Sequence, residues 1–192
     1  MTDSENNNLI NPDWAKHGYI QVYTGNGKGK TTASLGLAMR ALGRKWKVLL
    51  VMFLKGGNDY GELTSFQNLS PEIKNNLTIV QAGLDRIAYS SNINNDDKKA
   101  VQTGWELVKK SIINNEYNLI ILDEANIAIA LDLIDINEVI DILKSKPEEM
   151  EIVITGRNAD PRIIELAHLV SEIKPVKHYW NTGIVARKGI EY

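Results

Sequence analysis

The sequence contains no cysteine, which excludes disulfide bonds, zinc–thiolate sites and a cysteine nucleophile. It also lacks an apolar run of the roughly 18–20 residues that a membrane-spanning helix needs, and its polar N-terminus lacks the apolar core of a signal peptide. The 22 basic and 24 acidic residues give a net charge of −2, so no basic excess favours nucleic acid. These absences predict a soluble cytoplasmic protein that binds neither nucleic acid nor a membrane.

The 192 residues, 43% of them hydrophobic, are enough for one well-packed domain and too few for two independent cores. Residues 1–17 are rich in asparagine and acidic side chains and are predicted to form a flexible N-terminal segment. Residues 18–192 are predicted to form the single domain.

From residue 19 onward, apolar and β-branched runs alternate with stretches of helical periodicity. Strands are predicted over 19–24, 47–53, 77–81, 118–122, 151–155 and 170–173, and helices over 31–43, 62–69, 96–114, 137–146 and 162–168. The first helix is expected to present Leu35, Ala38, Met39 and Leu42 on one face and to end at a Gly43 cap. This order predicts an α/β fold with a mostly parallel, six-stranded sheet and helices on both faces.

The loop after the first predicted strand carries the strongest functional signal. Its residues, Thr24-Gly25-Asn26-Gly27-Lys28-Gly29-Lys30-Thr31-Thr32, lie between a strand and a helix, which is the context of a P-loop (Walker A motif). Glycines let backbone N–H groups converge on a phosphate, and the helix adds its positive N-terminal end. Lys30 supplies a mobile positive charge, and the Thr31 hydroxyl is placed to bind magnesium.

This loop is one residue shorter than the usual G-x-x-x-x-G-K-[ST] motif. Counting five residues back from Gly29 gives Thr24, and the first available glycine is Gly25. The phosphate cradle is therefore expected to be tighter than usual or held differently. The motif makes the predicted fold P-loop NTPase-like (RecA-like).

Three further charged positions are candidates for the same site. Asp123 and Glu124 end a buried strand, where P-loop proteins hold magnesium directly or through water. Arg157 ends the next strand and either pairs with phosphate or forms a surface salt bridge. Arg40 lies nine residues into the first helix and, on pattern alone, is a solvated helix residue.

Together these stretches resemble the ATP:corrinoid adenosyltransferases of the CobA/BtuR/CobO type. The resemblance covers roughly residues 18–192 and rests on GNGKGKTT, KVLLVMFLKGG, LIILDE, TGR, PVKH and the tail TGIVARKGIEY. A short P-loop is itself a trait of that family. The resemblance implies that the 5′-deoxyadenosyl group of ATP is transferred to the Co(I) centre of a corrinoid such as cobalamin, with release of triphosphate.

The resemblance also implies roles for individual residues. Residues 24–32 would bind ATP, with Lys30 and Thr31 contributing to catalysis. Glu124 would contribute to catalysis and, with Thr31 and Asp123, bind Mg²⁺. Arg40 and Arg157 match arginines near the nucleotide. Co(I) is a strong nucleophile, so no protein base is required.

Further expectations from the resemblance concern partners. The family is commonly dimeric, so a homodimer is expected. Reduction of cobalt implies an electron donor such as a reduced flavoprotein. Residues 1–17 could cover the corrinoid as a lid.

The middle of the chain departs from the family pattern. Members often carry a Gly-Phe-Thr-Trp-like stretch that helps to displace the lower axial ligand of the corrinoid, whereas this chain has Gly83-Leu84-Asp85-Arg86, with Tyr89 further on. Leu84 could replace an aromatic wedge, and Arg86 is a poorer substitute. Leu84 and Arg86 are the predicted corrinoid contacts, and altered corrinoid handling is the resulting hypothesis. His178, in PVKH, matches the family without a predicted role.

Two other functions are compatible with a P-loop. A small-molecule kinase would release ADP and need a base near the acceptor hydroxyl, for which Asp85 or Asp59 is available. A non-catalytic ATP-binding corrinoid carrier would bind ATP tightly and turn it over slowly or not at all.

Overall fold

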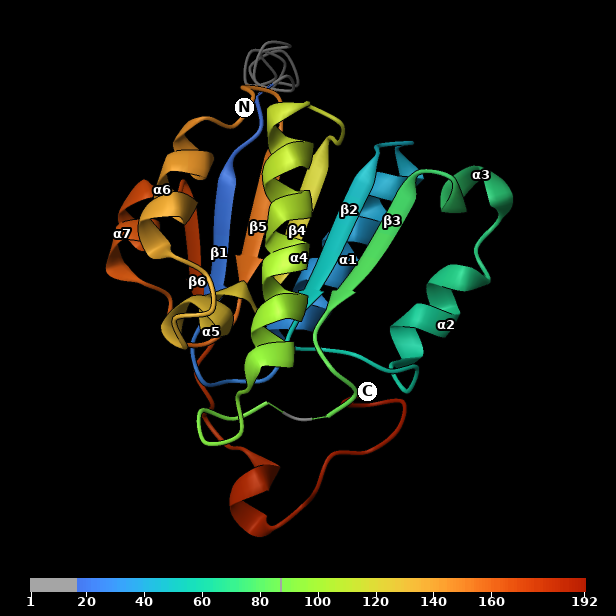
Figure 1. Ribbon diagram of the computed structural model, residues 1–192. Coiled ribbons are helices and arrows are strands. Elements are labelled where there is room, and N and C mark those ends of the chain that lie inside the picture. The colour runs from blue at the N-terminus through green and yellow to red at the C-terminus, as the bar shows by residue number, and fades with distance from the viewer. Residues whose placement is uncertain (1–16, 87) are drawn as a thin grey trace, which may run out of the picture.

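Six parallel strands form one sheet, in the order β3-β2-β4-β5-β1-β6, in the computed structural model of the protein, which describes residues 17–86 and 88–192 (Figure 1). The strands are β1 (Ile20–Thr24), β2 (Val48–Phe53), β3 (Leu77–Ala82), β4 (Leu119–Asp123), β5 (Glu151–Thr155) and β6 (Leu169–Glu172). All six strands were predicted, each within two residues of its observed ends. Residues 1–16 of the predicted N-terminal lid, which was expected over residues 1–17, lie outside the described residues.

Seven α-helices and a short 3₁₀-helix connect and cover the strands in the part of the chain that the structure describes. They are α1 (Lys30–Gly43), α2 (Gly61–Gln67), α3 (Pro71–Lys74), α4 (Asn95–Ile113), α5 (Ala125–Ala130), α6 (Ile136–Lys144), α7 (Pro161–Leu166) and η3 (Tyr179–Thr182). The five predicted helices are confirmed, whereas α3, α5 and η3 were not predicted. These three span at most six residues each and carry too few turns for a periodic signal.

The order of strands follows from their composition. β2 and β4 are apolar runs buried along their whole length, as strands covered on both faces must be. β6 is exposed along its length and takes an edge of the sheet. Because all strands are parallel, their carboxyl ends lie at the same end of the sheet. The strand pairing places Asp123 beside Met52 and Thr155 beside Tyr23.

Two apolar layers flank the sheet, and Figure 1 shows α4 in front of it and α1 behind it. Val101, Trp105, Val108 and Ile112 of α4 are at most 1% exposed and pack on one face. The opposite face is covered by α1 and by Phe66 of α2. The predicted α/β class, with a P-loop NTPase-like parallel sheet covered on both sides, is confirmed. No helix among the described residues is both long and apolar enough to cross a membrane.

Two details of α1 differ from the prediction. Met39 is 44% exposed, because Ala38 and Leu42 face the sheet and Met39 is rotated about 100° away from Ala38 on the helix. Gly43 remains helical, and Lys45 instead takes the left-handed conformation with φ 62°. The N–H of Trp46 donates to the Ala41 carbonyl at 3.1 Å, so the helix ends in a Schellman-type turn whose left-handed residue lies two positions after Gly43.

Gly36 and Gly104 provide a matched test of packing, because both lie inside helices. A Cβ added at Gly104 would lie 2.4 Å from the Cβ of Ala82, whereas one at Gly36 meets nothing within 4 Å. We expect Gly104→Ala to cost about 1–3 kcal/mol of unfolding free energy by overpacking. Gly36→Ala should add about 0.5–1 kcal/mol, since alanine is the better helix former. Urea denaturation measures both, and a G104A protein as stable as the wild type would contradict the tight contact.

Candidate active site

A cavity of about 690 Å³ opens at the carboxyl ends of the strands. Most of the predicted site residues line it, namely Asn26, Gly27, Lys28, Gly29, Lys30, Thr31, Thr32, Glu124 and Arg157. Thr24, Gly25 and Asp123 lie directly behind this lining, at the ends of β1 and β4 and in the loop. The cavity is also lined by residues that the sequence analysis did not single out as site residues, above all Lys55 and the C-terminal stretch from His178 to Tyr192.

The phosphate loop is held from two sides. The N–H of Gly27 donates to the Ile173 carbonyl, just after β6, at 2.7 Å. Gly25 has φ 94°, and a Cβ there would lie 2.5 Å from the same carbonyl oxygen, so only glycine fits. The ammonium of Lys30 folds back over the loop and donates to the carbonyls of Gly25 and Gly27 at 2.7 and 2.8 Å. The loop is therefore closed by its own lysine.

The start of α1 is open to an anion. Its N-cap is Gly29, which provides no side chain to the first turn, and no acidic residue occupies that turn. The unpaired N–H groups and the positive end of the helix dipole therefore face whatever binds at the loop. Burial is the main cause that lowers the pKa of the Lys30 ammonium, which is 7% exposed beside these groups.

Asp123 is the centre of a buried hydrogen-bond network. The Thr31 hydroxyl donates to its Oδ1 at 2.9 Å, and the Thr155 hydroxyl donates to the same oxygen at 2.7 Å. The ammonium of Lys55 donates to Oδ2 at 2.7 Å. One carboxylate thus joins the ends of β2, β4 and β5 to the first turn of α1.

Glu124 is held in a strained and poorly satisfied position. Its backbone is left-handed, with φ 58°, and its N–H donates to the Thr155 hydroxyl at 3.0 Å. Its Oε2 is buried and accepts no hydrogen bond from the described residues. Burial, followed by the neighbouring charge of Asp123, raises the pKa of the Glu124 carboxyl. A left-handed backbone and an unpaired buried acceptor occur together at this residue, so Glu124 has an oxygen free to bind a ligand.

The oxygens of Thr31, Asp123 and Glu124 are the hard donors that Mg²⁺ prefers. The residues therefore fit a magnesium ion that also takes phosphate oxygens and water, as nucleotide sites do. No group of three or more His, Cys, Asp or Glu side chains that could hold a metal occurs in the described parts of the chain. The fit therefore requires ligands from the substrate.

Lys55 is a site residue that the sequence analysis missed. It directly follows Leu54, a non-glycine residue with φ 58° at the end of β2. Burial by itself lowers the pKa of Lys55, but the charge and hydrogen bond of Asp123, together with the charges of Glu124 and Glu62, outweigh burial and raise that pKa. The sequence signals were a lysine next to two glycines at a strand end and the place of these residues in the stretch KVLLVMFLKGG that supports the resemblance.

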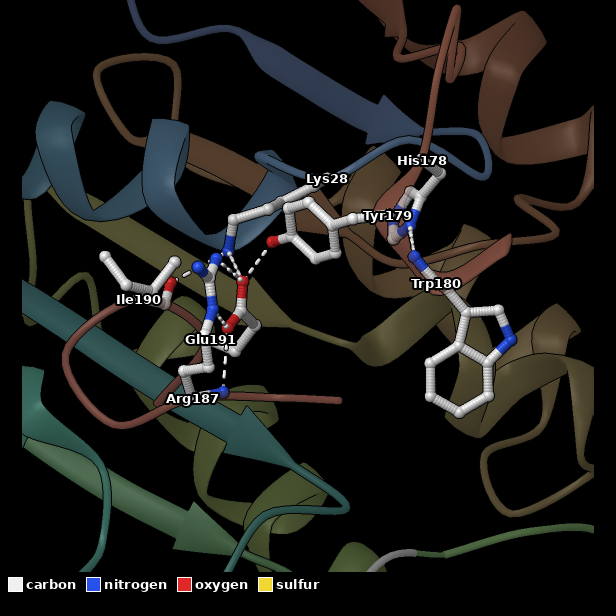
Figure 2. Close-up of polar contacts among 7 residues, drawn as sticks. All are labelled: Lys28, His178, Tyr179, Trp180, Arg187, Ile190 and Glu191. Atoms are coloured by element: carbon white, nitrogen blue, oxygen red, sulfur yellow. Dashed lines mark hydrogen bonds and ion pairs between the residues drawn. The ribbon is translucent and has the colours of Figure 1, made fainter. Parts of the chain in front are cut away.

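The C-terminal stretch closes over the phosphate loop, as Figure 2 shows. Lys28 donates to the Ile190 carbonyl at 2.8 Å and lies 3.4 Å from the Glu191 carboxylate. Glu191 also accepts hydrogen bonds from the Tyr179 hydroxyl and from the N–H of Arg187. These donors, the Tyr179 hydroxyl first, lower the pKa of Glu191 to about 2. A loop lysine is thus neutralised by a residue more than 160 positions later in the chain.

His178 also takes part in this arrangement. It lines the cavity, and its Nδ1 accepts a hydrogen bond from the N–H of Trp180 at 3.2 Å, which starts η3. In Figure 2 the Trp180 indole projects away from the Glu191 cluster, and it is 70% exposed. His178 therefore shapes the turn that carries Tyr179 over the loop.

Arg40 does not line the cavity, and the nucleotide role that the resemblance implies for it stays a prediction. It lies ten residues beyond Lys30, which is about 15 Å along α1. There it lines a separate apolar hollow with Leu37, Trp46 and Leu119. The interpretation of Arg40 from pattern alone, a solvated helix residue, agrees with this position.

The stretch 83–86 does not line the cavity either. The Arg86 guanidinium is engaged by Asp97, a residue 2% exposed at the start of α4, and donates to the Asn92 carbonyl at 3.0 Å. Arg86 is therefore an anchor of its own loop, and its expected corrinoid contact stays a prediction. A corrinoid contact of Leu84 stays a prediction. Asp59 and Asp85, the bases of the kinase alternative, do not line the cavity among the described residues.

Replacing Arg86 by methionine tests this anchor. The Asp97 carboxylate would still accept the hydrogen bond from the Asn94 N–H, at 2.9 Å, as part of the capping box of α4. This buried carboxylate would, however, lose its positively charged partner. We expect a loss of about 1–3 kcal/mol of unfolding free energy, below the cost for a fully buried pair. Arg162→Met, which breaks an exposed pair with Asp160, is the control and should cost about 0–1 kcal/mol. Equal losses in urea denaturation would contradict the anchor.

The chain matches the family ATP:corrinoid adenosyltransferase BtuR/CobO/CobP over residues 16–192. The chain belongs to this family. The corrinoid adenosyltransferase of Escherichia coli K12 is 35% identical over 177 residues, which cover 92% of this chain and 87% of that protein. The corrinoid adenosyltransferase CobA of Salmonella typhimurium is 34% identical with the same coverage.

An uncharacterized protein of Nostoc sp. is 34% identical over 180 residues, which cover 90% of this chain and 48% of that protein. The chain therefore spans about half the length of this relative and most of the length of the enterobacterial ones. As an ATP:corrinoid adenosyltransferase, the chain joins an adenosyl group from ATP to a corrinoid.

Proposed function

We propose that ATP lies in the cavity with its triphosphate on the phosphate loop, and that reduced cobalt of a corrinoid attacks C5′ from the open side. The Co–C5′ bond forms as the C5′–O bond breaks, and the electron pair leaves with inorganic triphosphate. The observation that carries this proposal is the Lys30-closed loop beside the Thr31–Asp123–Glu124 oxygens. No side chain needs to act as a base, because no proton is removed in the transfer.

The protein's contribution is to stabilise the negative charge that develops on the triphosphate. The first N–H groups of α1 and the ammonium of Lys30 are fixed before the reaction, so they stabilise this charge without reorganisation. Arg157 lines the same cavity and adds positive charge. A short loop suits a leaving group that is the whole triphosphate.

Magnesium is the proposed metal, held by Thr31 and Glu124, with Asp123 as a further ligand. It would neutralise triphosphate oxygens as a Lewis acid. Support comes from the unpartnered Oε2 of Glu124 and from the hard character of the three donors. A homodimer, a reduced flavoprotein as electron donor and a cytoplasmic location stay predictions.

An anaerobic assay with ATP, Mg²⁺ and chemically reduced Co(I) corrinoid tests this function. We expect loss of the Co(I) absorbance, a photolabile Co–C product and free triphosphate in the phosphorus NMR spectrum. ADP or orthophosphate with unchanged Co(I) would contradict adenosyl transfer and favour a kinase or ATPase. Tight ATP binding without turnover would favour the non-catalytic carrier.

A further inference from the structure

Lys55 is a buried cation that lies among the oxygens proposed for magnesium. Its ammonium is 2.7 Å from Oδ2 of Asp123 and 3.5 Å from the Thr31 hydroxyl. Its side chain is 16% exposed and lines the cavity. A positive charge of the protein therefore already stands where a metal ion would bind.

The backbone around Lys55 is fixed by close contact between two loops. Leu54 is left-handed, and its N–H donates to the Ala82 carbonyl at 3.0 Å. A Cβ at Gly83 would lie 2.3 Å from the backbone nitrogen of Lys55, and a Cβ at Gly56 would lie 2.5 Å from the carbonyl carbon of Leu84. A strained strand end packed this closely holds the Lys55 Cα in place, while the four-carbon side chain can still swing.

A magnesium ion and Lys55 compete for the same carboxylate. Oδ1 of Asp123 already accepts two hydroxyl hydrogen bonds, so its Oδ2, which pairs with Lys55, is the oxygen available to a metal. Two cations a few ångströms apart in a buried site repel strongly. The ammonium has three donors and would move towards the nearest unpaired anion in the cavity that it lines.

We propose that Lys55 exchanges Asp123 for the triphosphate when nucleotide and magnesium bind, and thereby stabilises the leaving group. This inference rests on the proposed function. Glu62 and Glu124 also line the cavity, and their charges act on Lys55, so they are the competing destinations. A triphosphate carries more negative charge than either carboxylate and offers more acceptor oxygens.

Binding of inorganic tripolyphosphate, measured by calorimetry with magnesium and again in EDTA, tests the exchange. With magnesium, Lys55→Met should bind about 10- to 100-fold more weakly than the wild type, as expected for one lost charged hydrogen bond. In EDTA the difference should narrow, because no ion displaces Lys55 from Asp123. Lys55→Arg, which keeps the charge, should recover part of the affinity.

Lys109→Met is the matched control, because Lys109 is 17% exposed and pairs with Glu106 and Glu138 at 2.7 and 2.6 Å, away from the cavity. It should bind tripolyphosphate like the wild type. Unchanged binding by K55M, or an equal loss with and without magnesium, would overturn the exchange. If K55M loses its cooperative unfolding transition, Lys55→Gln carries the same comparison.

If the wild type transfers the adenosyl group but K55M binds tripolyphosphate as tightly as the wild type does, the exchange alone is overturned. A wild type that neither binds tripolyphosphate nor forms a Co–C product overturns the proposed function and the exchange with it.

Discussion

Replacing Lys30 by methionine is expected to lower kcat/KM for ATP by about 100- to 1,000-fold, the usual cost of removing one fixed donor to a developing charge. Two effects combine in this variant. The leaving triphosphate loses a positive charge, and the carbonyls of Gly25 and Gly27 lose the donor that closes the short loop. Steady-state rates of Co–C bond formation at varied ATP concentration measure the effect.

Lys146→Met is the matched control for this variant. The Lys146 ammonium also donates to backbone carbonyls, to Gly18 at 2.6 Å and Pro147 at 3.2 Å, and burial lowers its pKa as it lowers that of Lys30. Lys146 lies at the amino ends of β1 and β5, which is the end of the sheet opposite to the cavity. K146M should lose stability but keep kcat/KM, and a K30M enzyme within a few-fold of wild type would contradict the assignment.

Glu124→Gln is the second variant with a large expected effect. It removes a proposed metal ligand, so kcat at limiting magnesium should fall by about 100-fold or more, as loss of several kcal/mol of charge stabilisation implies. High magnesium should restore part of the rate if Thr31 and Asp123 still bind the ion. A rate and magnesium dependence equal to wild type would exclude Glu124 from the metal site.

The same variant should be more stable than the wild type at high pH. Burial and then Asp123 raise the folded-state pKa of Glu124, so the folded protein binds more protons than the unfolded chain between the ordinary and the raised value. The charged Glu124 therefore lowers stability above that window. Without ligand, E124Q should exceed the wild type at pH 8, and the difference should vanish as pH falls towards about 4.

Glu138→Gln gives the opposite sign and serves as the control. Hydrogen bonds from Lys109 and then Trp105 lower the pKa of Glu138, so its charge stabilises the fold above the ordinary carboxyl pKa. E138Q should be less stable than the wild type at pH 8, and the deficit should shrink as pH falls. Urea denaturation at both pH values measures these changes in unfolding free energy. If E124Q and E138Q change stability at pH 8 in the same direction, this electrostatic account is contradicted.

Features set by neighbouring residues were predictable from the sequence. The phosphate loop was recognisable because Gly29, Lys30 and Thr31 act as one contiguous stretch between a strand and a helix. The strands followed from apolar runs, since burial on both faces demands them. Helix α4 followed from the spacing of Val101, Trp105, Val108 and Ile112, and all four proved buried.

Features set by distant residues were not predictable in this way. Arg86 was interpreted by its place in a family pattern, yet its geometry depends on the buried Asp97 at the start of α4. Arg40 was expected at the nucleotide because the resemblance placed it there, although ten helical residues carry it towards the other edge of the sheet. The left-handed Lys45 replaced Gly43 because the two hydrogen bonds of the turn fix which residue reverses the chain.

The sequence by itself determined the family, the α/β class and the residues of the phosphate loop, because these depend on local pattern and on contiguous motifs. Only the tertiary structure decided that Asp123 is shared by Thr31, Thr155 and Lys55, and that the C-terminal stretch closes over Lys28. The physical reason is that parallel strands bring their carboxyl ends to one edge. Side chains far apart in the chain then meet there as hydrogen-bond partners, and their burial and pKa depend on those meetings.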